Sequence, residues 1–385
     1  MMQRKLKYGV FDNVAIGPRA AGGLIYSGGL ANPKEYPVHC RHNRHGRPFN
    51  DAIEIDTSAL PKLTSDDGKA FVYGGTYQYH FGHLTAEFIH RLWILQQPEF
   101  ADCTALFIAD PEKAYVLEYF PQLMDYLGVK KWKLITESCV VEKLVTAEQG
   151  KTLGRKSHRH YTAHLANLAA QKNLFEDKGT PKKIALLRGH MTSRRYLGEM
   201  HLANYLAEQG YEVYYPEKHP IEAQLRTIAN ASHIVISDGS ICHLFDLLPK
   251  LQVHVAFLAR RPKAKLAKVS IAPKVKQLHT FSNASPLIIP RMGNGKPQET
   301  KALLYADTHE IVAFLKKHGF VPADAPKITG VPFAEDIKHY LEGRGAGLGS
   351  SERLEDLSIE LLAKQIHQLK SAKKGLGQRI RSIFL

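Results

Sequence analysis

The sequence predicts an α/β fold of two domains, each built on a parallel sheet, with a basic helical tail behind them. Three observations support this prediction. The chain has 385 residues, and at roughly 100 to 200 residues per domain that length suggests two domains with their own hydrophobic cores. Hydrophobic residues at 44% and charged residues at 23% are close to globular averages, which excludes a largely disordered or collagen-like chain. Short apolar runs also alternate with amphipathic stretches, as strands and helices do in α/β proteins.

The first predicted domain covers residues 1–178. Residues 8–60 indicate short strands and loops, and from Phe71 onward the alternation becomes regular. We expect strands over residues 71–75, 104–109, 132–135, 140–141 and 144–145, and helices over residues 84–95, 115–127 and 155–175. The polar segment of residues 176–181 marks the domain boundary.

The second predicted domain covers residues 179–345. We expect strands over residues 184–187, 211–215, 233–237 and 253–258, and helices over residues 198–209, 221–230 and 240–248. This order, with short loops, is typical of a parallel sheet covered on both faces, whose ligands bind beyond the carboxyl ends of the strands. The candidate site is therefore expected on the loops after Leu187, Tyr215 and Ser237.

The tail, residues 346–385, differs in character. Leucine and isoleucine residues fall on one helical face after Ser351, and basic residues then interleave with apolar ones up to Leu385. A basic amphipathic helix can lie on an anionic membrane surface, where each basic residue adds about 1 kcal/mol. Packing of the helix on its own protein, followed by a frayed end, is an equal alternative.

The net charge and the cysteine content narrow the possible classes of protein further. The formal net charge of +15 means that some surface attracts anions such as phosphate, nucleic acid or acidic lipid. No run of about 18 apolar residues is present and the N-terminal residues do not form a signal peptide, so we expect a cytoplasmic protein, or one peripheral on the inner face of the cytoplasmic membrane. The four cysteines are scattered without a CxxC pair, which predicts reduced core thiols and neither a zinc site nor disulfides.

Arginines follow the first strand of the second predicted domain. Arg188 comes directly after it, and Arg194 and Arg195 stand a few residues later, ahead of a helix. A guanidinium group is a planar fork that stays charged and donates two hydrogen bonds to a phosphate. These arginines are candidates for phosphate or pyrophosphate binding, with ordinary surface arginines as the alternative. The segment is neither a Walker loop nor a GxGxxG motif, so neither an ATPase nor a Rossmann dehydrogenase is indicated.

A second candidate segment, Asp238, Gly239 and Ser240, stands between a predicted strand and a predicted helix. Glycine lets the backbone approach a ligand there, and the free N–H groups of a helix start attract anions. Capping of the helix by Asp238 or Ser240 is the alternative. The basic residues expected at the same sheet edge favour anion binding.

In the first domain, His83 and Glu87 are four residues apart near a predicted helix start, which puts one above the other. A carboxylate beside an imidazole raises its basicity and fixes its tautomer, as a general base needs. A structural His–Glu pair is the alternative. The His- and Arg-rich residues 38–45 are interpreted as a solvated loop, with a metal or phosphate patch as the other reading.

These segments together resemble the family 61 glycosyltransferases, which include plant xylosyl and arabinosyl transferases, animal O-GlcNAc transferases of the secretory pathway, and bacterial capsule and lipopolysaccharide enzymes. The resemblance covers about residues 71–258 and rests on the order and spacing of several motifs. These motifs are the Gly74-Gly75 turn, His83 with Glu87, Arg91-Leu92-Trp93, residues 119–129, the segment from Arg188 to Arg195, residues 210–217, Gln224 and residues 231–236.

One element departs from the family pattern. The usual Gly-x-His-Gly-Ala-Gly is replaced by Asp238-Gly239-Ser240-Ile241-Cys242-His243, so Asp238 stands where the usual His does. This form is similar to bacterial members, which favours an enzyme of capsule, exopolysaccharide or lipopolysaccharide synthesis. Which side chain touches the nucleotide stays open.

The resemblance implies a GT-B-like architecture, with two Rossmann-like domains facing across a cleft, the acceptor on the first and a nucleotide-sugar donor, preferably UDP-linked, on the second. It implies an inverting transfer without a metal or other cofactor. A base removes the proton of the acceptor hydroxyl while the nucleoside diphosphate departs. His83 is the expected base, with Glu87 orienting it or acting as the base itself.

Basic side chains and a helix start would neutralise the leaving group. The residues expected at the donor nucleotide and diphosphate are Arg188, Arg194, Arg195, Tyr215, Pro216, Glu217, Asp238, Gly239, Ser240 and His243. Two rival functions stay open: a basic nucleic-acid-binding protein, which would lack any recognition motif, and a GT-B-like binding protein that has lost catalysis. The sugar, the acceptor, the linkage and the oligomeric state are not specified by the sequence.

Overall fold

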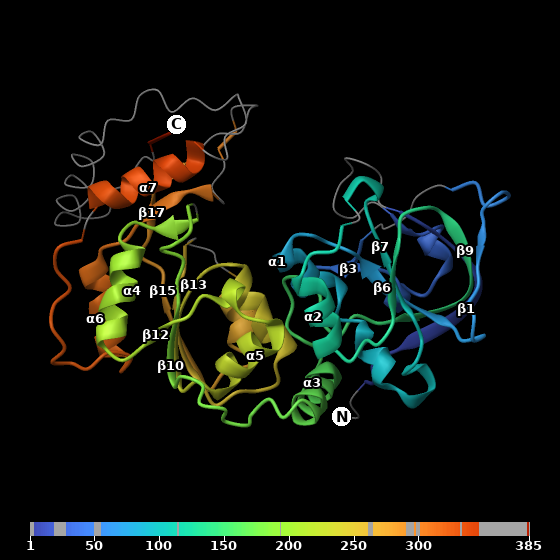
Figure 1. The fold of residues 1–385 in the computed structure, drawn as a ribbon, viewed down its shortest axis with the longest axis horizontal. Helices are drawn as coiled ribbons and strands as arrows, with labels where there is room; N and C mark the ends of the chain where they lie inside the picture. The colour runs from blue at the N-terminus through green and yellow to red at the C-terminus, as the bar shows by residue number, and fades with distance from the viewer. Residues whose placement is uncertain are drawn as a thin grey trace.

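The computed structural model describes residues 4–18, 28–49, 55–113, 115–192, 194–260, 265–289, 296–297, 301–331, 333–345 and 383–384. Its elements form two sheet-centred parts that lie side by side (Figure 1). We call residues 4–174 the N-terminal half and residues 183–345 the C-terminal half. The basic amphipathic tail expected over residues 346–385 lies outside the described residues, except for the short strand β18 (Ile383–Phe384).

The N-terminal half is built on a mixed sheet with the strand order β2-β1-β9-β6-β7-β8 and with β5 also paired to β9. Its strands are β1 (Tyr8–Gly17), β2 (Gly29–Leu30), β5 (Lys62–Leu63), β6 (Phe71–Thr76), β7 (Ala105–Ile108), β8 (Trp132–Ile135) and β9 (Cys139–Ala147), beside a small hairpin of β3 (Asn43–Arg44) and β4 (Arg47–Pro48). The parallel order is confirmed for β6, β7 and β8.

The prediction of a purely parallel sheet is wrong at β1. This strand runs antiparallel to β9, from Tyr8 opposite Ala147 to Ile16 opposite Cys139. The polar pair Asp12-Asn13 interrupts its apolar pattern, and for this reason residues 8–17 look like short strands and loops in the sequence.

The expected helix over residues 84–95 is also wrong in detail. The chain forms one α-helical turn, a π-helical turn and a 3₁₀ segment instead, and residues 84–95 are all buried, so packing and not helix propensity decides their backbone. The helical segments of this half are η1 (Pro33–Glu35), η2 (Val38–Cys40), α1 (Phe81–His83), η3 (Leu84–Phe88), η4 (Leu92–Gln96), η5 (Pro98–Phe100), η6 (Pro111–Lys113), α2 (Tyr119–Tyr126) and α3 (Arg159–Gln171).

The C-terminal half contains the predicted parallel sheet, in the order β12-β10-β13-β14-β15. Its strands are β10 (Lys183–Leu186), β12 (Glu212–Val213), β13 (His233–Ser237), β14 (His254–Leu258) and β15 (Gln277–Phe281). A second small sheet, which the sequence did not predict, has the order β11-β17-β16-β18, with β11 (Arg195–Tyr196), β16 (Ser285–Ile289) and β17 (Leu303–Tyr305).

Helices cover both faces of the parallel sheet, with α4 and α6 on one side and α5 on the other (Figure 1). The register explains the two faces: Ala185, Val235 and Ala256 lie opposite one another and pack toward α4 and α6, while their neighbours belong to the other core. The helical segments are α4 (Glu199–Glu208), η7 (Pro216–Lys218), α5 (Ile221–Asn230), the 3₁₀ helix η8 (Ser240–Leu247), the π-helical η9 (Ala267–Ile271), α6 (Thr308–Lys317) and α7 (Phe333–Gly345).

The two halves share a packed interface. One hydrophobic cluster contains Phe120 and Met124 of α2 together with Ile221 and Leu225 of α5. The buried Tyr126 hydroxyl donates to the carbonyl of Leu247 at 3.3 Å, which ties α2 to η8. In the part of the chain that the structure describes, none of the helices is long and apolar enough to cross a membrane.

Arg195 connects the small sheet to α7. Its side chain is fully buried and forms an ion pair with Asp336, and it also donates to the Asp336 carbonyl at 2.8 Å. The other carboxylate oxygen of Asp336 accepts from the backbone N–H of Gly198 at 2.5 Å. Arg195 therefore holds α7 and the start of α4 together.

Replacement of Arg195 by Met is expected to lower the free energy of unfolding by about 3–5 kcal/mol, because it leaves the Asp336 carboxylate buried without its partner. The control is Lys338→Met, which removes an exposed ion pair with Glu342 in the same helix and should cost less than about 1 kcal/mol. Urea denaturation of both variants gives the comparison. Equal small losses would show that Arg195 does not hold α7.

Candidate functional site

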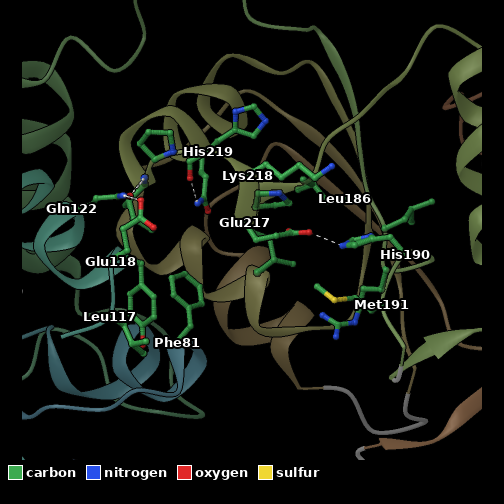
Figure 2. A pocket seen from close by; sticks show the side chains of 18 residues that line it. Phe81, Leu117, Glu118, Gln122, Leu186, His190, Met191, Glu217, Lys218 and His219 are labelled. Carbon is green, nitrogen blue, oxygen red and sulfur yellow. Dashed lines mark hydrogen bonds and ion pairs between the residues drawn. The ribbon is translucent and has the colours of Figure 1, made fainter. Parts of the chain in front are cut away.

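Two cavities lie between the halves, at the carboxyl ends of the parallel strands. Cavity A has a volume of about 700 Å³. One wall comes from the N-terminal half and the other from the C-terminal half (Figure 2). The lining residues are Phe81, Leu117, Glu118, Tyr119, Gln122, Leu186, Leu187, Arg188, His190, Met191, Pro216, Glu217, Lys218, His219, Pro220, Ile221, Gln224 and Ile241.

Cavity B is larger, about 920 Å³, and richer in basic side chains. The N-terminal half supplies His45, His80, Gly82, His83, Ala86, Lys151, Leu153 and Gly154. The C-terminal half supplies Arg194, Asp238, Gly239, Ser240, His243, Arg260, Lys265, Leu266, Val269, Ser270, Ala302 and Leu304.

The two cavities adjoin at a close contact between the halves. Phe81 and Ile241 line cavity A, and the next residues, Gly82 and Ser240, line cavity B. A Cβ atom on Gly82 would lie only 2.8 Å from the Ser240 hydroxyl oxygen, so glycine is what permits this approach.

His83 and Glu87 form the expected pair. His83 Nδ1 lies 2.8 Å from Glu87 Oε1, and the imidazole lines cavity B while the carboxylate is fully buried behind it. The π-helical turn η3 preserves this contact although the regular helix ends at His83. The His83 ring is thereby fixed with its other nitrogen, Nε2, free of Glu87.

Two further basic side chains, His42 and Arg44, surround the Glu87 carboxylate. His42 Nε2 and Arg44 Nε lie 3.6 and 3.3 Å from Glu87 Oε2, and the His42 ring stacks on Phe88 at 4.8 Å. Burial raises the pKa of Glu87, but His42, His83 and Arg44 together lower it to about 2.

The interpretation of residues 38–45 as a solvated loop is wrong at Cys40 and His42, which are buried, whereas Val38 and His45 are exposed. The phosphate alternative stays a prediction, and His45 lines cavity B.

The loops of the C-terminal half are held by one buried carboxylate. Glu199, at the start of α4, accepts hydrogen bonds from the backbone N–H of Arg188 at 2.9 Å, from the backbone N–H of Tyr196 at 2.9 Å and from the Ser237 hydroxyl. These donors follow β10, form β11 and end β13. Glu199 therefore fixes the loops of this sheet edge relative to one another.

Arg194 is held in the left-handed backbone region, with φ at +61°, and its carbonyl accepts from Arg188 Nε at 2.9 Å. Its guanidinium points to cavity B, as does that of Arg260. Burial lowers the pKa of Arg194, and the charge of Arg260 lowers it further. Two neighbouring guanidinium groups at one cavity wall are suited to an anion.

The structure brings most of the predicted site residues to the two cavities. Arg188, Pro216 and Glu217 line cavity A, and the Tyr215 ring packs on His190 at 4.4 Å. The residues that line cavity B are His83, Arg194, Asp238, Gly239, Ser240 and His243. Arg195 lies in neither cavity and is bound to Asp336, so its expected contact with a diphosphate is corrected.

Four charged residues near cavity B were missed as site residues: Lys151, Asp246, Arg260 and Lys265. Arg260 follows β14 at the same sheet edge, so the rule that selected Arg188 also selects it. Lys151 and Asp246 form a buried ion pair between the halves at 2.8 Å. No local pattern in the sequence predicts that Lys151 and Asp246 form this ion pair.

The family model of glycosyltransferase 61 matches residues 81–255, from α1 to β14. Residues 81–255 are thus similar to glycosyltransferase 61 domains. The family 61 segment includes His83, Glu87, Arg188 and His243, and thus both walls of the site. None of the curated proteins compared with this chain matches it.

A pH-dependent loss of stability is expected from Glu87 of the family 61 segment. Its pKa of about 2 lies below the usual 4.5, so its contribution is complete above about pH 5 and is lost as the pH falls from 4.5 to 2. At neutral pH this contribution is about 3 kcal/mol. Urea unfolding at several pH values should show wild type and Glu87→Gln converging as the pH falls.

The control for this experiment is Glu142→Gln in β9, because the Glu142 side chain is about half exposed in its pair with Lys62. Its difference from wild type should be small at every pH. A constant gap between wild type and Glu87→Gln from pH 7 to pH 3 would contradict the low pKa of Glu87.

Proposed function

We propose that this protein is an inverting, metal-independent glycosyltransferase that transfers a sugar from a nucleotide donor, preferably a UDP-sugar, to a growing bacterial surface glycan. The proposal includes a GT-B-like arrangement, with the acceptor on a first domain of residues 1–178 and the donor on a second domain of residues 179–345. A peripheral position on the inner face of the cytoplasmic membrane, through the tail, belongs to the same proposal.

The observation that carries the proposal is the meeting of two unlike cavities at one sheet edge inside the family 61 segment. Cavity A combines apolar side chains such as Phe81 and Met191 with polar ones such as Gln122 and Glu217, and such a mixed lining suits a nucleoside. Cavity B offers the His83–Glu87 pair facing basic side chains, which suits a hydroxyl to be deprotonated beside a departing phosphate.

Among the two candidate bases, His83 is favoured. The Glu87 carboxylate is too weak a base with a pKa of about 2, and it is fully buried behind the imidazole. Neutral His83 would take the acceptor proton on Nε2, while Nδ1–H donates to Glu87. The acceptor oxygen then bonds to the anomeric carbon, and the electron pair of the breaking bond passes to the diphosphate oxygen.

The donor would lie along the C-terminal half. Its nucleoside is expected in cavity A beside Tyr215, Pro216 and Glu217. Its diphosphate would meet Arg188, Arg194 and the backbone around Gly239 and Ser240, with Asp238 and His243 nearby. These basic groups would neutralise the charge of the leaving diphosphate, as a metal ion does in metal-dependent enzymes. No further cofactor is proposed.

Donor binding can be tested by a thermal-shift panel of UDP-, GDP-, CMP- and dTDP-sugars on wild type, Arg188→Ala and Lys250→Ala. A ligand at 100 times its Kd adds about 2.7 kcal/mol of stability. We expect one nucleotide to stabilise wild type and Lys250→Ala, whose side chain is exposed and lines neither cavity, but not Arg188→Ala.

If no nucleotide stabilises wild type, the transferase proposal fails. A steep salt dependence of RNA or DNA retention would then favour the nucleic-acid-binding alternative. If a nucleotide stabilises Arg188→Ala as much as wild type, the protein binds the donor but Arg188 does not contribute to that binding.

The base assignment predicts that His83→Gln lowers donor turnover by about 10²–10⁴-fold, since a positioned general base contributes that factor. The nucleotide-induced thermal shift should persist in the variant. The matched control is His309→Gln, an exposed histidine of α6 that lines neither cavity and should leave turnover unchanged. Full turnover in His83→Gln would exclude this residue as the base, and a loss of nucleotide binding would indicate a donor contact instead.

A further inference from the structure

A buried charged cluster lies behind cavity B, where the two halves meet. Lys151 Nζ of the N-terminal half lies 2.8 Å from Asp246 Oδ1 of η8, and the two side chains are 1% and 0% exposed. The other carboxylate oxygen, Oδ2, accepts from the Ser270 hydroxyl at 2.9 Å and lies 3.2 Å from His243 Nδ1. Lys151, His243 and Ser270 of this cluster line cavity B, as does His83, and Asp246 lies behind them.

Each member of the cluster is held from more than one side. Lys151 Nζ also donates to the Ser270 hydroxyl at 3.3 Å, so Ser270 bridges the cation and the anion. Burial raises the pKa of Asp246, but Lys151 and His243 lower it to about 2, so the group is a carboxylate throughout the physiological range. Because Nδ1 faces this carboxylate, Nε2 of the His243 ring points away from Asp246.

Burying these charges costs desolvation free energy, which suggests that the charged groups have a function besides stabilising the fold. A buried ion pair loses much of its attraction to desolvation, and well-packed apolar side chains of the same volume often stabilise a protein equally well. The halves already share an apolar interface through α2 and α5. The charge of Asp246 is therefore better explained by what it does to His243 than by what it adds to docking.

We propose that Asp246 and Lys151 are positioning residues for transfer: Asp246 orients His243 toward the β-phosphate of the donor, and Lys151 holds Asp246 from the other half. This rests on the proposed function, which places the diphosphate in cavity B. His243 makes and breaks no covalent bond. With Nδ1–H directed at Asp246, this role requires the imidazolium form, which donates a hydrogen bond from Nε2–H to the phosphate oxygen that receives the electron pair of the breaking sugar–oxygen bond.

The arrangement links the interface to the chemistry. Lys151 belongs to one half and Asp246 to the other, so the oriented His243 exists only while the halves are docked. His83 and His243 then face the same cavity from opposite halves, each backed by a buried carboxylate. One is placed for the acceptor and the other for the leaving group.

The test compares the binding of UDP and UMP by calorimetry, because the two ligands differ by the β-phosphate. If the panel selects another base, the matching di- and monophosphate are used. Wild type should prefer UDP, and His243→Gln should reduce that preference about tenfold, as for a charge-assisted hydrogen bond. The double variant Lys151→Met/Asp246→Asn removes both charges of the ion pair, leaves the buried Lys274 bound to the Leu248 carbonyl, and should reduce the preference equally. Adding His243→Gln to the double variant should change the preference less than about twofold.

Two further variants make the result specific. Tyr126→Phe removes a different hydrogen bond between the halves, to the Leu247 carbonyl of the same helix, and should keep the full preference for UDP. Lys151→Arg retains the charge and should also keep the preference for UDP.

A third variant, Ser270→Ala, replaces the double variant if the double variant does not fold. It removes a donor to Asp246 without changing any charge, and it should also lower the preference for UDP.

The outcomes separate the two proposals. If the double variant weakens UDP and UMP alike, or if His243→Gln still costs tenfold within it, the pair acts only on docking and the inference is overturned. An undiminished preference for UDP in the double variant, or in Ser270→Ala where only that variant folds, overturns it as well. Absence of nucleotide binding to wild type overturns the proposed function, and this inference with it.

Discussion

The contact between Gly82 and Ser240 is the constraint on which the site depends. At this point α1 and η3 of one half meet η8 of the other. A side chain at position 82 would meet the Ser240 hydroxyl at 2.8 Å and its Cβ at 3.1 Å, so it would push the halves apart. Because His83 follows Gly82 and Gly239 precedes Ser240, one contact sets the distance between the candidate base and the candidate diphosphate site. The two cavities adjoin at this contact, so the mixed lining of cavity A continues into the more basic lining of cavity B.

Each half contributes a histidine with a buried carboxylate behind it. Glu87 is kept ionised by His42, His83 and Arg44, and Asp246 by Lys151 and His243. In both cases the compensating cation comes from a segment distant in sequence, so the charge of the carboxylate depends on the completed fold. This arrangement gives two imidazoles with the same kind of support but different surroundings: His83 approaches from the N-terminal half, whereas His243 shares its wall with Arg194 and Arg260. The proposed roles, one histidine at a hydroxyl and the other at a phosphate, therefore rest on the difference in neighbours and not on the histidines themselves.

The sequence was sufficient where local pattern decides structure. The helix α5 and the strands β8 and β13 have the predicted bounds, because apolar periodicity and short loops define them. The sequence was insufficient where contacts between distant segments determine the local structure. The antiparallel pairing of β1 with β9 and the breaking of the helix after His83 follow from burial against other elements. Arg194 and Arg195 show the limit most clearly: they are neighbours of the same type, yet one lines cavity B and the other is bound to Asp336, because the backbone turns at Arg194.

The net charge of +15 does not translate directly into an anion-binding surface. Several cations near the site already have protein partners: His42 and Arg44 contact Glu87, and Arg91 is fully buried and donates to the Cys40 carbonyl at 3.2 Å. Lys151 is paired with Asp246. Among the described residues, by contrast, none offers the Arg194 guanidinium a hydrogen bond or an ion pair, although it is partly buried and close to Arg260. Repulsion between two cations at one cavity wall is relieved when an anion binds between them. The local pairing of charges, more than their total, therefore makes this wall of cavity B the candidate for the proposed diphosphate contact.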